Sequence, residues 1–255
     1  MNELKPGAPR SVLVTGGGRG IGAATALRCA QAGWAVAVNC TRDTASAQAV
    51  VAHIQAEGGT ALVVQADVSD EAQVLAMFAR IDAELPPLHG LVNNAGVVDV
   101  GARVDAMSLA RWQRMFAINV FGSFLCAREA LRRLSTRHGG AGGAIVNLSS
   151  AAARLGSPGQ YVDYAAAKGA IDTFTLGLAK EVAAEGVRVN AVRPGIIDTE
   201  IHASGGQPER VMQMAPQVPM QRAGSADEVA QAIVWLLSDA ASYTTGAIID
   251  VTGGR

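Results

Sequence analysis

The chain has 255 residues and a formal net charge of -1; 49% of the residues are hydrophobic and 17% are charged. This composition is typical of a folded, soluble α/β protein and argues against a disordered one. No block of Lys or Arg resembles a nucleic-acid footprint, and no run approaches the roughly 18 apolar residues of a membrane helix. We therefore expect no nucleic-acid partner, no membrane contact and a cytoplasmic location.

The three cysteines, Cys29, Cys40 and Cys126, are widely spaced and lack CxxC or histidine partners. Structural metal sites and disulfide frameworks need such groupings. We therefore predict neither a disulfide nor a metal site.

Short apolar runs rich in β-branched residues alternate along the chain with longer helical patterns. Seven runs have this character: 11–15, 35–39, 60–65, 90–94, 143–149, 187–192 and 247–251. No linker separates them, so they predict one domain over residues 1–255, built on a doubly wound seven-stranded parallel sheet. In such sheets ligands bind at the carboxyl ends of the strands.

The first predicted strand leads into a glycine turn and a helix, in the segment "TGGGRGIG". Gly16, Gly20 and Gly22 follow a GxxxGxG spacing. This spacing differs from GxGxxG, but it also lets backbone amides and a helix N-terminus approach a pyrophosphate closely. A glycine turn can also serve packing alone. Its place after the first strand of a parallel sheet favours dinucleotide binding and a Rossmann fold.

The segment "YVDYAAAK" contains Tyr161, Tyr164 and Lys168. Residues four apart share a helix face, so Tyr164 and Lys168 can act side by side. A tyrosine with the ordinary pKa of about 10 exchanges protons poorly at neutral pH, and a nearby ammonium lowers that pKa. We predict that Tyr164 is a catalytic acid/base, that Lys168 lowers its pKa, and that Tyr161 is a cleft wall.

These motifs, with "DVSD", "NNAG", "NLSS", "RPG" and the terminal "TGG", resemble the short-chain dehydrogenase/reductase family over nearly the whole chain. The closer resemblance is to a bacterial subgroup labelled glucose 1-dehydrogenase-like or 3-oxoacyl-carrier-protein reductase-like. The resemblance implies a nicotinamide cofactor. The cofactor contacts that it implies are Gly16, Gly20, Ile21, Gly22, Asp67, Val68, Asn93, Ala95, Gly96, Tyr164, Lys168, Pro194, Gly195, Ile197 and Thr199. Asp67 and Thr199 have the alternative role of capping the helices that follow them.

The end of the second predicted strand bears on the choice between NADP and NAD. Enzymes that use NAD usually carry an acidic residue there, whereas this chain has Cys40. Arg19 and Arg42 can reach the same side of the adenosine ribose, where arginine suits a phosphate. Alternatively both are solvated loop residues, with Asp43 diluting the positive field. We predict NADP, with NAD as the alternative.

Ser150 lies 14 positions before Tyr164, one more than is usual in the family. The resemblance implies that Ser150 orients the substrate oxygen, and an extra residue in "GSPGQYVD" would explain the spacing. The alternatives are Ala151 at the serine position, which would leave the site defective, and Ser149 in the catalytic role.

Asn119 falls within a predicted long helix, where an unbonded buried amide is costly. The resemblance implies that Asn119 holds a water in a proton relay from Lys168 to solvent. A kinked helix in which the amide bonds a backbone group is the other interpretation, and the two are compatible.

Residues 198–224 are rich in Gly, Pro, Met and Gln, which suits a lid that closes over a substrate. The segment has no cationic cluster for a phosphopantetheine carrier. We expect Ser150, Arg154, Tyr161 and His202 to face the substrate.

The sequence thus predicts an NADP-dependent oxidoreductase that interconverts a secondary alcohol or hemiacetal with its carbonyl compound. A glucose 1-dehydrogenase-like activity is one candidate for this role. The alternatives are a 3-oxoacyl-carrier-protein reductase-like ketoreductase and a non-catalytic dinucleotide-binding regulator. Apolar helices beyond what one sheet face needs suggest self-association, and the resemblance implies a homotetramer.

Overall fold

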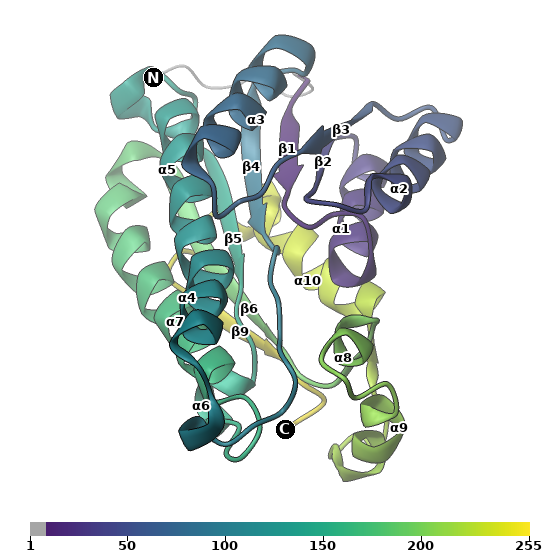
Figure 1. Cartoon of the computed structure of the whole chain (residues 1–255). Helices are drawn as coiled ribbons and strands as arrows, with labels where there is room; N and C mark the ends of the chain where they lie inside the picture. The colour runs from purple at the N-terminus through teal and green to yellow at the C-terminus, as the bar shows by residue number, and fades with distance from the viewer. Residues whose placement is uncertain (1–8) are drawn as a thin grey trace.

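A computed structural model describes residues 9–255, with the exception of the His202 side chain. Seven parallel strands form one sheet in the order β3-β2-β1-β4-β5-β6-β9, as the sequence predicted (Figure 1). The strands are β1 Ser11–Val14, β2 Ala35–Cys40, β3 Ala61–Gln65, β4 Leu88–Asn93, β5 Gly143–Leu148, β6 Val187–Pro194 and β9 Ile248–Val251. The order reverses between β1 and β4, and in doubly wound sheets that crevice binds the ligand.

Helices cover both faces of the sheet. They are α1 Gly20–Gln31, α2 Thr44–Ala56, α3 Glu71–Glu84, α4 Leu109–Phe116, α5 Gly122–Leu134, α6 Ala152–Leu155, α7 Val162–Val182, α8 Ile201–Ser204, α9 Arg210–Met214 and α10 Ala226–Leu237. One core cluster joins the sheet to α1, α2 and α10, and a second joins it to α3, α5 and α7. The two strands β7 Ile197–Asp198 and β8 Gly224–Ser225 pair separately.

The alternation of side chains along each strand divides the core between these two faces. Val12 and Val14 belong to the first cluster and Leu13, between them, to the second. All three are fully buried, because a strand covered on both faces exposes neither set of side chains. Buried apolar strands of this kind fix the sheet and bring the carboxyl ends of β1, β4, β5 and β6 together.

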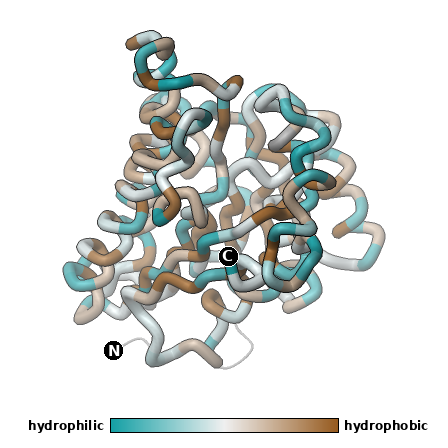
Figure 2. Tube along the Cα trace, turned by 90° about the horizontal axis from the view of Figure 1, so that it is seen from below, coloured by the Kyte–Doolittle hydropathy of each residue, from teal (hydrophilic) through white to brown (hydrophobic). Residues whose placement is uncertain are grey.

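The predicted lid, residues 198–224, lies at the end of the molecule where α6 and the last residues of the chain also lie (Figure 1). Figure 2 looks directly onto this end. The residues after β9 pack on the lid, since the Met220 amide donates to the Gly253 carbonyl at 3.1 Å. The end of the chain is therefore part of the same surface as the lid.

Two absences concern only the residues that the structure describes. No helix there has the length and apolar character needed to cross a membrane. No group of three or more His, Cys, Asp or Glu side chains there could hold a metal ion.

Candidate active site

A cavity of about 490 Å3 lies at the carboxyl ends of the central strands, between the glycine turn, the start of α7 and the lid. Ligands of doubly wound sheets bind at this edge. The predicted site residues that line it are Ile21, Gly96, Ser150, Tyr161, Tyr164, Lys168, Pro194, Gly195, Ile197 and Thr199.

The three residues predicted to form the reacting centre come together in the structure: two lie on α7 and one follows the end of β5. Ser150 lies close enough to the Tyr164 hydroxyl to lower the pKa of the tyrosine. Lys168 Nζ lies 5.6 Å from the centroid of the Tyr164 ring and donates to the Leu148 carbonyl at 2.6 Å. The side-by-side placement of Tyr164 and Lys168 follows from their spacing of four on one helix.

The pKa values of this pair differ from the expectation that Lys168 lowers the pKa of Tyr164. Burial raises the pKa of Tyr164 to about 12, and the hydrogen bond from Ser150 opposes that shift only partly. Burial also lowers the pKa of Lys168 to about 8, against the attraction of Asp172. In the protein alone, loss of hydration outweighs the charge of the lysine, because both groups lie in the same low-dielectric site.

Ser150 keeps its contact with Tyr164 despite the longer spacing. The chain between α6 and α7 turns through three residues with positive φ: Gly156 at 71°, Ser157 at 45° and Gly159 at 70°. This loop includes most of the segment in which we expect the extra residue. The Ser149 hydroxyl donates to the Lys168 carbonyl at 3.2 Å. The geometry therefore favours Ser150 over Ser149, and Ala151 offers no polar group.

Asn119 lies in a π-helical turn, Ala117–Phe121, which interrupts what the sequence predicted as one long helix. Its amide nitrogen donates to the carbonyls of Met115 and Val97, and its oxygen accepts the Val97 amide at 3.1 Å. A Cβ built on Gly96 would lie 2.8 Å from Asn119 Oδ1 and 3.7 Å from Lys168 Nζ. The side chain is thus fully bonded to backbone, in a type of turn that is frequent at functional sites, and it lies close to Lys168.

Asn93 does not line the cavity, contrary to the expectation. Its side chain is buried in the core, where Nδ2 donates to the Ser123 carbonyl and to Asn147 Oδ1. Asn94 lines the cavity instead, and it donates to the carbonyls of Thr15 and Gly16. Consecutive residues at a strand end point to opposite sides. The two adjacent asparagines of "NNAG" therefore could not both face the cavity, and this alternation could have pointed to Asn94.

Arg154 also lies elsewhere than expected. It pairs with Asp250 of β9, which in turn lies 3.6 Å from Arg193. Arg193 donates to the buried Asp172 at 2.8 Å. The expectation that Arg154 faces the substrate is therefore wrong, because a charged neighbour from a strand distant in sequence holds its guanidinium. The His202 side chain, also expected at the cleft, lies outside the described residues.

The glycine turn leaves a space beside its backbone that side chains would occupy. A Cβ on Gly22 would lie 2.3 Å from the Gly16 carbonyl oxygen, and Gly16 itself has φ of 61°. Helices α2, α3, α4 and α10 each begin with a side-chain cap, but Arg19 at the start of α1 provides none. The N-terminal amides of α1 stay available for an anion, and a dinucleotide pyrophosphate fits there.

The expected adenosine pocket is bordered by exposed arginines. Arg19 and Arg42 are both exposed, and Arg19 donates to the Ser204 hydroxyl of the lid at 3.4 Å. Asp43, which we expected to dilute their field, is the N-cap of α2, and hydrogen bonds from Ser46 lower its pKa. The carboxylate is thereby engaged with the helix N-terminus.

Asp67 is not a helix cap, since Asp70 accepts the Gln73 amide at the start of α3. Asp67 Oδ1 accepts from the amide and the hydroxyl of Ser69, at 2.9 and 2.6 Å. The Val68 side chain is buried in the second core cluster, so only its backbone is left to face an adenine. The Ala95 amide donates to Thr15 Oγ1 at 2.9 Å, which ties the "NNAG" turn to β1.

Tyr161 lines the cavity as expected, and among the lining residues that the sequence analysis missed are two that carry a charge. These are Arg210, at the start of α9, and Arg255, the last residue of the sequence. The Arg210 guanidinium carbon lies 5.5 Å from the centroid of the Tyr161 ring. The two arginines are far apart in sequence, so no local pattern signalled them.

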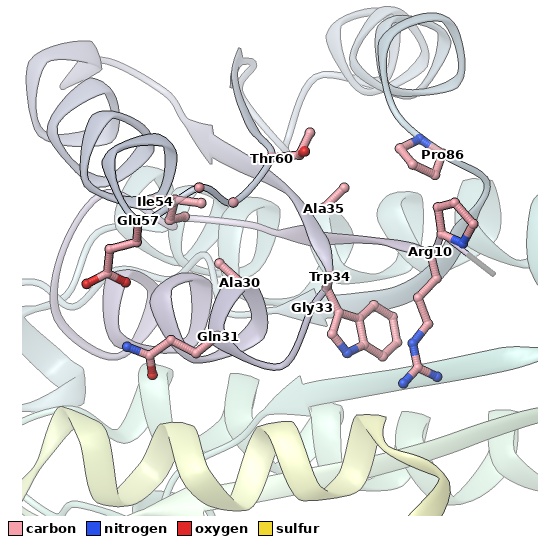
Figure 3. A pocket seen from close by; sticks show the side chains of 13 residues that line it. Arg10, Ala30, Gln31, Gly33, Trp34, Ala35, Ile54, Glu57, Thr60 and Pro86 are labelled. Atoms are coloured by element: carbon pink, nitrogen blue, oxygen red, sulfur yellow. The ribbon is translucent and has the colours of Figure 1, made fainter. Parts of the chain in front are cut away.

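A second hollow, of about 440 Å3, opens at the opposite edge of the sheet, near the starts of β1, β2 and β3 (Figure 3). There Arg10 lies over the Trp34 ring at 4.4 Å and pairs with Asp239. None of the predicted catalytic side chains lines it. This hollow lies at the amino ends of the strands, whereas ligands of doubly wound sheets bind at the carboxyl ends.

Comparison with known proteins agrees with this fold. A family model described as "Enoyl-(Acyl carrier protein) reductase" matches residues 16–255. The chain is 59% identical over 243 residues to the uncharacterized oxidoreductase YgfF of Escherichia coli (strain K12), covering 95% of this chain and 98% of that one. It is 37% identical over 260 residues to an NADPH-dependent aldehyde reductase-like chloroplastic protein of Arabidopsis thaliana, covering 98% and 95%.

A solved structure supports the same assignment. The crystal structure of a dehydrogenase/reductase from Sinorhizobium meliloti 1021 superimposes with a TM-score of 0.88 at 31% identity, covering 99% of this chain and 96% of that one. The fold and these relatives define an oxidoreductase that acts on CH–OH groups, in a family that binds a nicotinamide cofactor. The chain belongs to the short-chain dehydrogenase/reductase family.

Proposed function

We propose that this enzyme is an NADP-dependent oxidoreductase that interconverts a secondary alcohol or hemiacetal with its carbonyl compound. One observation carries the proposal: Ser150, Tyr164 and Lys168 meet in a cavity that Ile21 of the glycine turn also lines. A non-catalytic regulator would have no need of a partly buried tyrosine beside a buried lysine, since loss of hydration at these groups costs stability. A glucose 1-dehydrogenase-like activity remains one candidate within this class.

In the reductive direction, Tyr164 donates its proton to the carbonyl oxygen of the substrate. Ser150 donates a hydrogen bond to the same oxygen and holds it against the tyrosine. Lys168, when protonated, stabilises the phenolate that remains, and Asn119 supports the path by which the proton is replaced. When bound, the nicotinamide supplies or accepts the hydride. Proton transfer by a positioned group contributes about 10²- to 10⁴-fold to rates.

The proposed cofactor site extends from the glycine turn, where the pyrophosphate binds, to the cavity, where the nicotinamide lies. We propose that the uncapped amides of α1 bind the pyrophosphate, and that Asn94, Gly96, Tyr164 and Lys168 surround the nicotinamide ribose. The backbone from Pro194 to Ile197 and the Thr199 side chain bind the carboxamide. Asp67 and the Val68 backbone border the adenine.

The preference for NADP rests on the charges around the second strand end. Cys40 is a buried neutral residue at the position where a ribose-binding acid would repel a phosphate. Arg19 and Arg42 form no salt bridge in the described part of the chain, although the charge of Arg19 contributes to the lowered pKa of Asp43. The name of the Arabidopsis relative includes NADPH dependence, which supports the same choice.

We expect kcat/KM with NADPH to exceed that with NADH by about tenfold or more, because each charge-assisted bond to a phosphate contributes roughly 1.5–3 kcal/mol. Arg19→Ala and Arg42→Ala should each lower kcat/KM with NADPH and leave kcat/KM with NADH nearly unchanged. Absorbance assays with both cofactors measure this. A preference for NADH of tenfold or more would contradict the proposal.

Carbonyl compounds and alcohols of varied structure, assayed with both cofactors, test the activity itself. The panel should include an aldose sugar, a 3-oxoacyl thioester and simple secondary alcohols. Turnover of any of them that requires Tyr164 supports the proposal. Tight NADPH binding without turnover on the whole panel would favour a regulator.

We also propose that copies of the chain form a homotetramer. Phe121 of the π-helical turn is 58% exposed and Leu176 of α7 is 43% exposed, on helices beside one another in the fold. At the other side, β9 is an edge strand paired only with β6, and Tyr243 before it is fully exposed. Open strand edges and grouped apolar side chains favour self-association.

Static light scattering at micromolar concentration should therefore report a mass near four times 26.1 kDa. Phe121→Asp is expected to lower the mass to that of a smaller species, because it places a charge on an apolar contact. A monomeric wild-type protein over the accessible concentration range would exclude the tetramer.

A further inference from the structure

Two arginines line the cavity that holds Tyr164, and one of them is the last residue of the sequence. Arg210 begins α9 in the lid, and Arg255 follows the tail that binds Met220 of the lid. Both side chains are half-buried. Helix α9 and the chain end lie at the same end of the molecule (Figure 1). The fold thus brings two guanidinium groups to one wall of the catalytic cavity.

Neither guanidinium forms an ion pair with an acidic side chain within the described residues. Arg210 Nη1 donates to the side-chain oxygens of Gln160 and Gln207, at 2.7 and 2.6 Å. These bonds use both hydrogens of Nη1, so Nε and Nη2 stay available to a ligand. Arg222, also in the lid, instead pairs with Glu228 at 2.6 Å and does not line the cavity.

Two unpaired cations in one cavity repel each other. Burial and the charge of Arg210 both lower the pKa of Arg255. Charges withdrawn from water without a partner cost free energy, and a bound anion offsets that cost. The cavity is therefore positive where the lid and the chain end meet.

Arg210 lies beside the start of the helix that carries Tyr164. The guanidinium of Arg210 lies over the Tyr161 ring, and Tyr161 precedes Tyr164 by one helical turn. Leu155, Ile201 and Met214 add apolar surface to the cavity. A ligand that fits has a short apolar body, a carbonyl at Tyr164 and a negative charge at its other end.

We propose that the substrate carries an anionic group, a carboxylate or a phosphate, which Arg210 and Arg255 bind while its carbonyl lies at Ser150 and Tyr164. The inference rests on the proposed function, because it places the anion in the same cavity as the reaction. Arginine suits this role because its planar fork donates two parallel hydrogen bonds to carboxylate or phosphate oxygens.

Binding of unreactive probes tests the anion site without catalysis. Hexanoate, its neutral isostere hexanamide, and butyl phosphate would be titrated by calorimetry into the protein saturated with NADP. We expect hexanoate or butyl phosphate to bind at least about tenfold more tightly than hexanamide, as charge-assisted bonds require. The tighter of the two anions identifies the chemical source. Equal affinity for hexanoate, butyl phosphate and hexanamide would overturn the proposal.

Variants then locate the site. Arg210→Met and Arg255→Met should each reduce the anion preference about tenfold, and Arg210→Lys should retain part of it, because the charge remains while the fork is lost. Arg222→Met, which removes the same charge from the lid outside the cavity, should keep the wild-type preference. A preference that survives both methionine variants would also overturn the proposal.

Kinetics separate this inference from the proposed function. 5-Oxohexanoate should be reduced with a higher kcat/KM than its methyl ester, mainly through a lower KM, and Arg210→Met should remove the difference. Equal turnover of acid and ester would refute the anion site and leave the oxidoreductase intact. A third outcome is that neither compound is turned over, while hexanoate still binds more tightly than hexanamide and this difference depends on Arg210. That outcome would support the anion site and count against the proposed reaction.

Discussion

Tyr164→Phe is expected to lower kcat/KM for carbonyl reduction by about 10²- to 10⁴-fold, the contribution of a positioned general acid. The Tyr164 hydroxyl lies in the cavity close to Ser150, and phenylalanine keeps the ring while removing the proton. Since at most one polar interaction is lost, the free energy of unfolding should fall by no more than about 1 kcal/mol. Steady-state kinetics and denaturant unfolding measure the two effects separately.

Tyr161→Phe is the matched control, because it makes the same chemical change one turn earlier on the same wall of the cavity. Its effect should be confined to KM, since the Tyr161 hydroxyl has no contact with Ser150. NADPH binding, followed by fluorescence, should persist in both variants. If Tyr164→Phe retained wild-type kcat, or if Tyr161→Phe were the inactive variant, the proposed mechanism would be wrong.

Gly22→Ala should both destabilise the fold and weaken NADPH binding. Helix propensity alone would make alanine more stable by roughly 1 kcal/mol. The added Cβ would lie 2.3 Å from the Gly16 carbonyl oxygen and 2.6 Å from Asn94 Nδ2, however. Overpacking of this kind costs about 1–3 kcal/mol, and it displaces the turn whose amides are proposed to bind the pyrophosphate. Denaturant unfolding and fluorescence titration with NADPH test the two effects.

Ala24→Gly provides the control within the same helix. It makes the reverse change at a half-buried position of α1, and its cost should be close to the intrinsic difference of about 1 kcal/mol. NADPH affinity should hardly change. An increase in stability for Gly22→Ala with unchanged NADPH affinity would show that the turn can relax around a side chain.

The correspondence between sequence and structure is closest where the information is local. Continuous β-branched runs predicted the seven strands because a strand buried on both faces must be apolar throughout. The spacing of four between Tyr164 and Lys168 predicted their proximity because one helix carries both. Gly16, Gly20 and Gly22 predicted the turn because only glycine tolerates the close backbone contacts found there.

The differences arise where a partner comes from another part of the chain. Arg154 was expected in the cleft from its distance to Ser150, but Asp250 of β9 holds it. For Asn119 the sequence offered a kinked helix with a backbone-bonded amide as one interpretation, and the structure has a π-helical turn there, but the partner Val97, from the segment after β4, could not be predicted. In each case the deciding contact spans many residues, and no local pattern records it.

The sequence by itself determined the family, the sheet, the glycine turn and the identity of the tyrosine and lysine pair, because these depend on residue type and short spacing. Tertiary structure decided the electrostatics of the cavity. Burial, a property of the whole fold, raises the pKa of Tyr164 to about 12 and lowers that of Lys168 to about 8. Packing of the chain end on the lid brings Arg255 to the cavity beside Arg210, since charges distant in sequence meet only when the chain has folded.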